Sequence, residues 1–251
     1  MNDTKDTTGT SLSEKLSYLR LRTLSAHWDA YLKLAAQKRY SHDRLLRHIV
    51  GEEYRSKRDN ARRLRLQKAR IPEALVIETF PFDRQPKLNK KKLMAHYDSM
   101  TYMSEAQNII WLGGTGCGKT GLATSFLIHA INHGHSGRYV HFAELVNELY
   151  RACADHSQEK VLKKYLRYDC LHIDEIGYVE VEPEQVGQFF TLMHKRHKRK
   201  PTLITSNLGF GDWNSFLKND HLTAALIDRL TENSHVINMK GCKSLRPKLS
   251  Q

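Results

Sequence analysis

A glycine-rich loop between an apolar run and a helix-forming run carries the clearest chemical signal in the sequence. The segment IIWLGGTGCGKTGLA, residues 109–123, contains the pattern G-x-x-x-x-G-K-[ST]. In such loops backbone N–H groups converge on phosphate oxygens at a helix N-terminus. Lys119 would reach the β- and γ-phosphates of a nucleotide, and the Thr120 hydroxyl would bind Mg²⁺. The predicted phosphate-binding residues are Gly113, Gly114, Thr115, Gly116, Cys117, Gly118, Lys119 and Thr120.

Two adjacent acids end a later apolar run, CLHIDE, at residues 170–175. Asp174 could hold Mg²⁺ through water, and Glu175 could act as the general base that polarises an attacking water. A small-molecule kinase more often needs only the aspartate, and the chain has no Asn-Lys-x-Asp guanine reader. The acidic pair therefore favours hydrolysis of ATP.

Two further polar residues follow in the order that such a site needs. Asn207 ends the run TLITSN and is either a turn former or a side chain that orients water near the γ-phosphate. Arg229 lies in ALIDRLTENSHVI, which has an apolar face. It is either a solvated arginine or an arginine finger that reaches the γ-phosphate of a neighbouring subunit. The second interpretation predicts a homo-oligomer with ATP between subunits.

Alternating strand-like and helical runs indicate the framework that would position these residues. Strand-like runs begin near 108, 137, 170, 201 and 234, with longer amphipathic segments between them. This pattern predicts an α/β fold in which helices flank a parallel sheet. Residues 1–75 have helical periodicity and predict a small all-helical domain. Prolines and a lysine triplet interrupt residues 76–107, which we interpret as a linker and the entry to an ATPase domain over residues 108–251.

The charge of the chain favours a polyanionic partner. Forty Lys+Arg against 27 Asp+Glu give a net charge of +13, and residues 1–75 hold 17 of these basic residues against 9 acidic ones. Double-stranded DNA suits such a surface, and contacts with its phosphates would be largely independent of base sequence and weakened by salt. The candidate DNA-binding residues are Arg55, Lys57, Arg58, Arg62, Arg63, Arg65, Lys68 and Arg70.

Two other features bear on location and partners. A second basic run, HKRHKRK at residues 194–200, is either a solvated helix end or part of a DNA-facing surface. No run of about 18 apolar residues and no apolar signal core is present, so we expect a cytoplasmic protein with no membrane partner.

Four segments together resemble the IstB family of insertion-sequence transposition helper ATPases, relatives of the DnaC helicase loaders in the AAA+ class. These segments are WLGGTGCGKTGLA, YDCLHIDEIGYVEVEPEQVGQFFTLMHKRH, TLITSNLGFGDW and ALIDRLTENSHVINMKGCKSLR. The resemblance implies that residues 113–120 are Walker A, Asp174 and Glu175 are Walker B, and Asn207 is sensor 1. It likewise implies that Arg229 is the arginine finger and Arg246 is sensor 2.

The resemblance also implies a biological role. Such helpers oligomerise on target DNA with ATP and recruit or stimulate a partner transposase. A DnaC-like loader of a replicative helicase would use the same ATPase core and is one alternative. A DNA-binding scaffold that does not hydrolyse ATP, with Glu175 idle, is the other. Because five residues follow Arg246, we expect an AAA+ domain without a full helical lid.

Overall fold

The computed structural model describes residues 10–178 and 181–246 and divides into two compact units, Met1–Leu64 and Arg65–Gln251. The smaller unit is helical. It contains α1 (Leu12–Tyr18), α2 (Arg22–Gln37) and most of α3 (His42–Ala69). Across the described ranges, no helix has both the length and the apolar composition needed to cross a bilayer, including the 28-residue α3.

Local hydrogen bonds explain where the helices of the smaller unit begin. Ser11 and Glu14 form a capping box at the start of α1. The start of α2 has no such local cap, and Glu53 of α3 takes its place. The Glu53 carboxylate is 7 % exposed and accepts the N–H groups of Thr23 at 3.0 Å and Leu24 at 3.1 Å. The free donors and partial positive charge of a helix N-terminus stabilise this buried acid.

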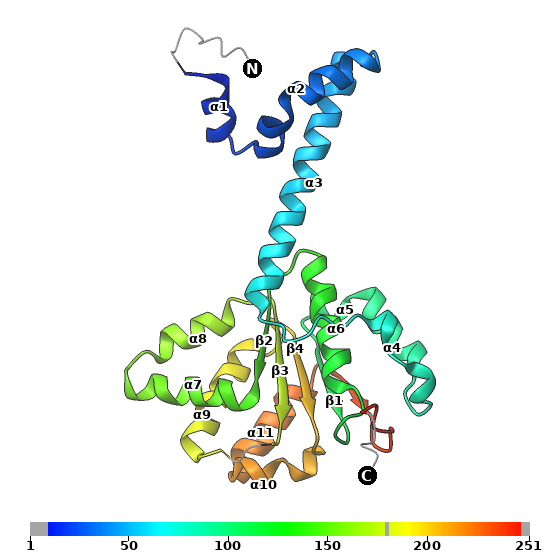
Figure 1. Cartoon of the computed structure of the whole chain (residues 1–251). Coiled ribbons are helices and arrows are strands. Elements are labelled where there is room, and N and C mark those ends of the chain that lie inside the picture. Colours follow the sequence, from blue (N-terminus) through cyan, green and yellow to red (C-terminus); the bar gives the residue numbers. More distant parts are fainter. Residues whose placement is uncertain (1–9, 179–180, 247–251) are drawn as a thin grey trace, which may run out of the picture. The chain divides into compact units, whose positions relative to one another are not determined.

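A five-stranded parallel sheet forms the centre of the larger unit, as the alternating pattern predicts (Figure 1). The strand order is β2-β3-β4-β1-β5. The strands are β1 (Asn108–Leu112), β2 (Gly137–His141), β3 (Cys170–Ile176), β4 (Thr202–Ser206) and β5 (Ser234–Asn238). Because the sheet is parallel, the carboxyl ends of all five strands lie along one edge.

Helices cover both faces of this sheet, so its central strands are buried on both sides. In β1, Ile110 and Leu112 belong to one apolar core, whereas Ile109 and Trp111 belong to the other, as the alternation of side chains along a strand requires. The first core includes side chains from α7 (Phe142–Ala154), α8 (Gln158–Leu166), α9 (Pro183–Arg196), α10 (Trp213–Leu217) and α11 (Asp220–Thr231). The second is built largely around α6 (Lys119–Asn132).

Residues 76–107, which we interpreted as a linker, contain regular structure and contribute to the second core. They include 3-10 turns at Ile77–Thr79 and Phe82–Arg84, then α4 (Lys90–Ser99) and α5 (Thr101–Ser104). Ile77, Leu93 and Tyr102 are at most 2 % exposed. Proline interrupts the helical periodicity here, but these apolar side chains still pack against α6.

Candidate functional site

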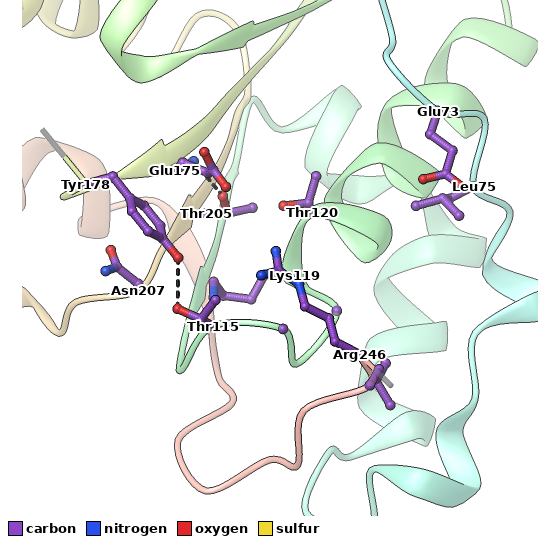
Figure 2. Close-up of a pocket in the computed structure, with 13 residues that line it drawn as sticks. Glu73, Leu75, Thr115, Lys119, Thr120, Glu175, Tyr178, Thr205, Asn207 and Arg246 are labelled. Carbon is purple, nitrogen blue, oxygen red and sulfur yellow. Dashed lines mark hydrogen bonds between the residues drawn. The ribbon is translucent and has the colours of Figure 1, made fainter. Parts of the chain in front are cut away.

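A pocket of about 600 Å³ lies where the carboxyl ends of β1, β3 and β4 meet the loop before α6 (Figure 2). This edge is where ligands bind in open α/β sheets. The pocket is lined by Glu73, Leu75, Thr115, Gly116, Gly118, Lys119, Thr120, Glu175, Tyr178, Thr205, Asn207, Leu245 and Arg246. Side chains that are far apart in the sequence therefore meet around one cavity.

Two glycines of the loop have backbone conformations and neighbours that exclude a side chain. Gly116 and Gly118 have φ values of 79° and 97°, which favour glycine. A Cβ on Gly116 would lie 2.5 Å from Ser244 Oγ, and one on Gly118 would lie 2.5 Å from a ring carbon of Phe80. The loop thus permits two other segments to approach it closely.

Lys119 begins α6 and points back across the loop. Its ammonium donates to the carbonyl oxygens of Gly113 at 2.8 Å and Gly114 at 2.9 Å. The residue is 8 % exposed, and burial lowers the pKa of its side chain. Phosphate oxygens are stronger acceptors for this ammonium than neutral carbonyls are.

Asp174 lies behind the lining side chains and accepts several hydroxyl hydrogen bonds. Thr120 Oγ1 lies 3.0 Å from Oδ1 and Tyr139 donates to Oδ2 at 2.8 Å, while Thr205 also donates to Oδ1. Burial acts to raise the pKa of Asp174, which is 1 % exposed, but its polar neighbours His172, Thr205 and Tyr139 hold that pKa below the usual range. Asp174 is therefore an ionised carboxylate next to the Thr120 hydroxyl.

Glu175 owes its direction to a β-bulge. Ile173 pairs with Ile204 and Ile176 with Ser206, so two acids on β3 lie opposite Thr205 alone. Glu175 has φ 62°, and its N–H donates to Thr205 Oγ1 at 2.9 Å. In a regular strand, successive side chains point to opposite faces. The bulge allows Glu175 to line the pocket while its neighbour Asp174 bonds to Thr120.

Asn207 and Arg246 also line the pocket, as Figure 2 shows. Asn207 follows β4, and its buried Oδ1 has no hydrogen-bond partner among the described residues. Arg246 lies close to the loop, since a Cβ on Gly116 would be 3.5 Å from its Cγ and Cδ. The two side chains thus bring a free amide oxygen and a guanidinium to the same cavity.

Four predicted residues of the loop and of β3 do not line this pocket: Gly113, Gly114, Cys117 and Asp174. Cys117 is 1 % exposed, and its thiol donates to the Gly114 carbonyl at 3.0 Å. Its side chain belongs to the second apolar core. Cys117 therefore contributes its backbone to the phosphate-binding loop, while its side chain points away from the pocket into this core.

Arg229 also lies outside the pocket of its own chain. Its Nε donates to His194 Nδ1 at 3.1 Å, and Nη1 donates to the Ala225 carbonyl at 3.0 Å. The guanidinium lies 4.8 Å from the centre of the Phe190 ring. These contacts hold Arg229 against α9.

Most of the basic run at 194–200 is used in contacts within the larger unit. Arg196 is 1 % exposed and donates to the carbonyls of Tyr165, Tyr168 and Pro201 and to the Thr202 hydroxyl. His197 and Lys198 contact Glu232. Lys200 donates to the carbonyls of Leu166 and Arg167. With His194, which bonds to Arg229, five of the seven residues therefore have structural contacts that the sequence did not indicate.

Seven of the eight candidate DNA-binding residues lie on α3, and Arg70 follows its end. All eight are exposed except Arg65, which is partly buried. Arg55 pairs with Glu52, and Lys57 Nζ lies 3.9 Å from Glu53 Oε1. The contact of this set with DNA stays a prediction.

Sequence reasoning missed several residues that shape the pocket. Thr205 bonds to both acids of β3, and Tyr178 shares a 2.8 Å hydrogen bond with Thr115. Glu73 and Leu75 line the opposite side, shortly after α3. Thr205 lies two positions before Asn207, a spacing that places both on one face of a strand and could have indicated it.

Comparison with known proteins identifies relatives that are named for ATP binding, as a phosphate-binding loop at this pocket leads one to expect. A protein of the insertion sequence IS21 from Pseudomonas aeruginosa, named for ATP binding, is 30 % identical over 226 residues, which cover 90 % of this chain and 85 % of the relative. A counterpart in IS232 of Bacillus thuringiensis subsp. berliner is 29 % identical over 230 residues, which cover 92 % of each chain.

Solved structures show the same fold. A DnaC helicase loader has 20 % identity and a TM-score of 0.54, with 67 % of this chain and 98 % of that chain covered. DnaA from Aquifex aeolicus bound to AMPPCP has 15 % identity and a TM-score of 0.55, with 68 % and 51 % covered. The model of the family described as IstB-like ATP binding protein matches residues 14–251, and the chain belongs to this family.

Proposed function

We propose that the pocket binds ATP and hydrolyses it, with Glu175 as general base. The observation that carries this proposal is the meeting of Lys119, Glu175 and Asn207 around one cavity. Glu175 would take a proton from the attacking water as that water adds to the γ-phosphorus, while the bond from this phosphorus to the β,γ-bridging oxygen breaks and ADP leaves. The unpaired Oδ1 of Asn207 would accept a hydrogen bond from the same water. Lys119 and Arg246 would bind the phosphates and stabilise the charge that develops on them.

A second, apolar pocket of about 190 Å³ continues from the first and suits a base. The two share Leu75, Gly118 and Leu245, and the second also includes Phe80. The hydroxyls near it already donate to backbone carbonyls, Thr79 to Val76 at 2.9 Å and Ser125 to Gly121 at 2.7 Å. An adenine ring would therefore meet aliphatic and aromatic side chains there.

The residues present fit Mg²⁺ that accompanies the nucleotide. An ionised Asp174 lies beside the Thr120 hydroxyl, and hard divalent cations prefer such oxygen ligands. When bound, Mg²⁺ supplies charge neutralisation at the β- and γ-phosphates. Thr120 would bind the ion directly, and Asp174 would hold it through water.

Substitution of Glu175 by glutamine tests hydrolysis separately from binding. Glu175→Gln keeps the size of the side chain and removes the base, so ATP turnover should fall by about 10²- to 10⁴-fold. Binding of a fluorescent ATP analogue should change little. Glu184→Gln, on α9, is a matched control outside the pocket. Turnover that is unchanged in Glu175→Gln would contradict the assignment.

For the whole chain, we propose an ATP-dependent, DNA-binding helper of insertion-sequence transposition. It would assemble as a homo-oligomer on duplex DNA with ATP between subunits and recruit or stimulate a partner transposase. Relatives named for insertion sequences support this setting. The exposed basic residues of α3 support the DNA contact, and the position of Arg229 outside its own pocket suits a role in a neighbouring site.

Assembly and partner recovery test this role. Sedimentation with duplex DNA should show large complexes with ATP and smaller ones without it. Affinity capture from cells that carry the transposase of the same insertion sequence should recover that transposase. Recovery of a replicative helicase alone would instead support the loader function.

A further inference from the structure

Gln85 is a buried polar residue outside the nucleotide pocket. It follows the turn Phe82–Arg84 and is 1 % exposed. Its amide nitrogen donates to the carbonyls of Cys117 at 3.2 Å and Lys243 at 2.6 Å, and its amide oxygen accepts the N–H of Lys243 at 3.0 Å. One side chain thus joins the phosphate-binding loop to a segment more than 120 residues further along.

The segment that Gln85 holds is the C-terminal strap, residues 239–246, which carries Arg246. The strap is attached to the loop region at two other points. Met239 N–H donates to the Leu112 carbonyl at 2.7 Å, and Leu245 N–H donates to the Gly116 carbonyl at 2.9 Å. The bonds of Gln85 lie between these points, at Lys243.

Close contacts show how tightly the strap lies on the loop. A Cβ on Gly113 would lie 2.9 Å from backbone atoms of Met239, and one on Gly116 would lie 2.5 Å from Ser244 Oγ. Small displacements of the strap would therefore move Arg246 relative to the loop. The strap itself contains neither helix nor strand among its described residues, so its position depends on such contacts.

The chemistry of an amide makes Gln85 difficult to replace. Both carbonyls need a donor, and the Lys243 N–H needs an acceptor, so a residue must offer both at once. A glutamate of the same length accepts but cannot donate. A methionine of similar volume does neither, and it leaves buried backbone groups without partners.

We infer that Gln85 is a positioning residue that fixes the strap on the loop so that Arg246 faces the bound nucleotide. This inference rests on the proposed binding of ATP in the pocket. Gln85 bonds to the loop at the Cys117 carbonyl but does not line the pocket, so we expect it to act on the nucleotide through Arg246. Loss of Gln85 should weaken nucleotide binding only while Arg246 is present to be positioned.

A double-mutant cycle on the full chain tests this dependence. The Kd of a fluorescent ATP analogue is measured for the parent, Gln85→Met, Arg246→Ala and the double variant. We expect Gln85→Met to raise the Kd by about tenfold in the parent and by less than about twofold in the Arg246→Ala background, because residues that act as a unit are not additive. Gln107→Met, a matched change at a residue that does not line the pocket, should leave the Kd unchanged.

Hydrogen exchange provides a readout that does not depend on catalysis. Without nucleotide, the strap peptide of Gln85→Met should exchange faster than that of the parent, whereas peptides of β1 should not. If Gln85→Met fails to fold, Lys243→Pro removes the strap N–H while Gln85 remains, and the same cycle applies. An equal rise in Kd with and without Arg246, or no rise at all, would overturn the inference. If the parent binds the analogue but does not hydrolyse ATP, the proposed hydrolysis would be wrong while the inference about Gln85 would stand.

Discussion

The nucleotide pocket and helix α3 use charged residues in opposite ways. Lys119 and Asp174 are 8 % and 1 % exposed, and each is hydrogen-bonded to fixed partners. Along α3, the side chains of Arg55 and Lys57 are 59 % and 51 % exposed, and they pair with acids one turn away. The pocket thus holds charges in place, whereas α3 presents them to solvent.

This difference determines how substitutions should act. A buried charge is costly unless its partners are present, so removal of one pocket residue affects a specific step strongly. Exposed charges interact weakly and are screened by salt, so each residue of α3 contributes a small part of a sum. The expected effects on ATP turnover and DNA affinity therefore decrease from the pocket, and from the residue proposed to complete a neighbouring pocket, to α3.

Arg229→Ala should produce the largest change after loss of the base itself. If Arg229 completes a neighbouring site, its loss should reduce ATP turnover by about 10³-fold. In an equal mixture of Arg229→Ala and Glu175→Gln, a site would be active where an Arg229→Ala subunit supplies the pocket and a Glu175→Gln subunit supplies Arg229. Random assembly should therefore restore activity at about a quarter of the sites. Turnover in the mixture, compared with each variant alone, is the measurement.

Arg199→Ala is the matched control for this mixing experiment. Arg199 is an exposed arginine just beyond α9 that does not line the pocket. It should hydrolyse ATP like the parent, and mixing it with Glu175→Gln should give no gain beyond dilution. A mixture of Arg229→Ala and Glu175→Gln that stays inactive, although it assembles, would contradict a role for Arg229 in a neighbouring site.

Thr205→Val should have a smaller effect within one chain. The Thr205 hydroxyl donates to Asp174 and accepts the N–H of Glu175, so valine leaves both without this partner. We expect about tenfold slower turnover and a free energy of unfolding lower by about 1–3 kcal/mol. Thr231→Val is the control, since that hydroxyl bonds to helix carbonyls away from the pocket. Parent-like turnover in Thr205→Val would show that the bulge does not depend on this hydroxyl.

The bulge also shows what sequence could and could not predict. Residue spacing predicts five strands and their order along the chain. It also predicts that Lys119, Glu175 and Asn207 follow strand ends, which meet at one edge of a parallel sheet. The direction of Glu175 does not, because adjacent residues on a regular strand point to opposite faces. The bulge in β3, where two acids lie opposite Thr205 of β4, brings Glu175 into the pocket, and this pairing of two strands is not visible in local spacing.

The structure also differs from the sequence-based expectation at residues that we interpreted as solvent-exposed or as part of a linker. Arg196 looks like part of a basic surface run, yet it is buried against the carbonyls of Tyr165, Tyr168 and Pro201. Gln85 lies in a proline-interrupted stretch, yet it bonds to the phosphate-binding loop. In both cases most partners are backbone groups, which have no signature in the sequence. Such contacts depend on tertiary packing rather than on local pattern.

Paired substitutions on α3 should give the smallest effect and the clearest test of its role. Arg58 and Arg62 lie four residues apart and are exposed, so both can face one stretch of DNA. If each contacts a phosphate, Arg58→Gln with Arg62→Gln should lower the slope of log K against log salt by about 2 for duplex DNA. The loss should be equal for DNA of unrelated sequences.

Arg47→Gln separates a phosphate contact from a general effect of charge. Arg47 lies on the same helix, and its Nε is 2.9 Å from Asp43, so part of its charge is compensated locally. Its loss changes the net charge by the same amount as one α3 substitution above. If Arg47→Gln lowers the slope as much as Arg58→Gln alone, DNA affinity follows net charge and not these positions. A slope that falls only for Arg58 and Arg62 would locate the DNA contact on that part of α3, because the number of released counterions reports phosphates that are contacted.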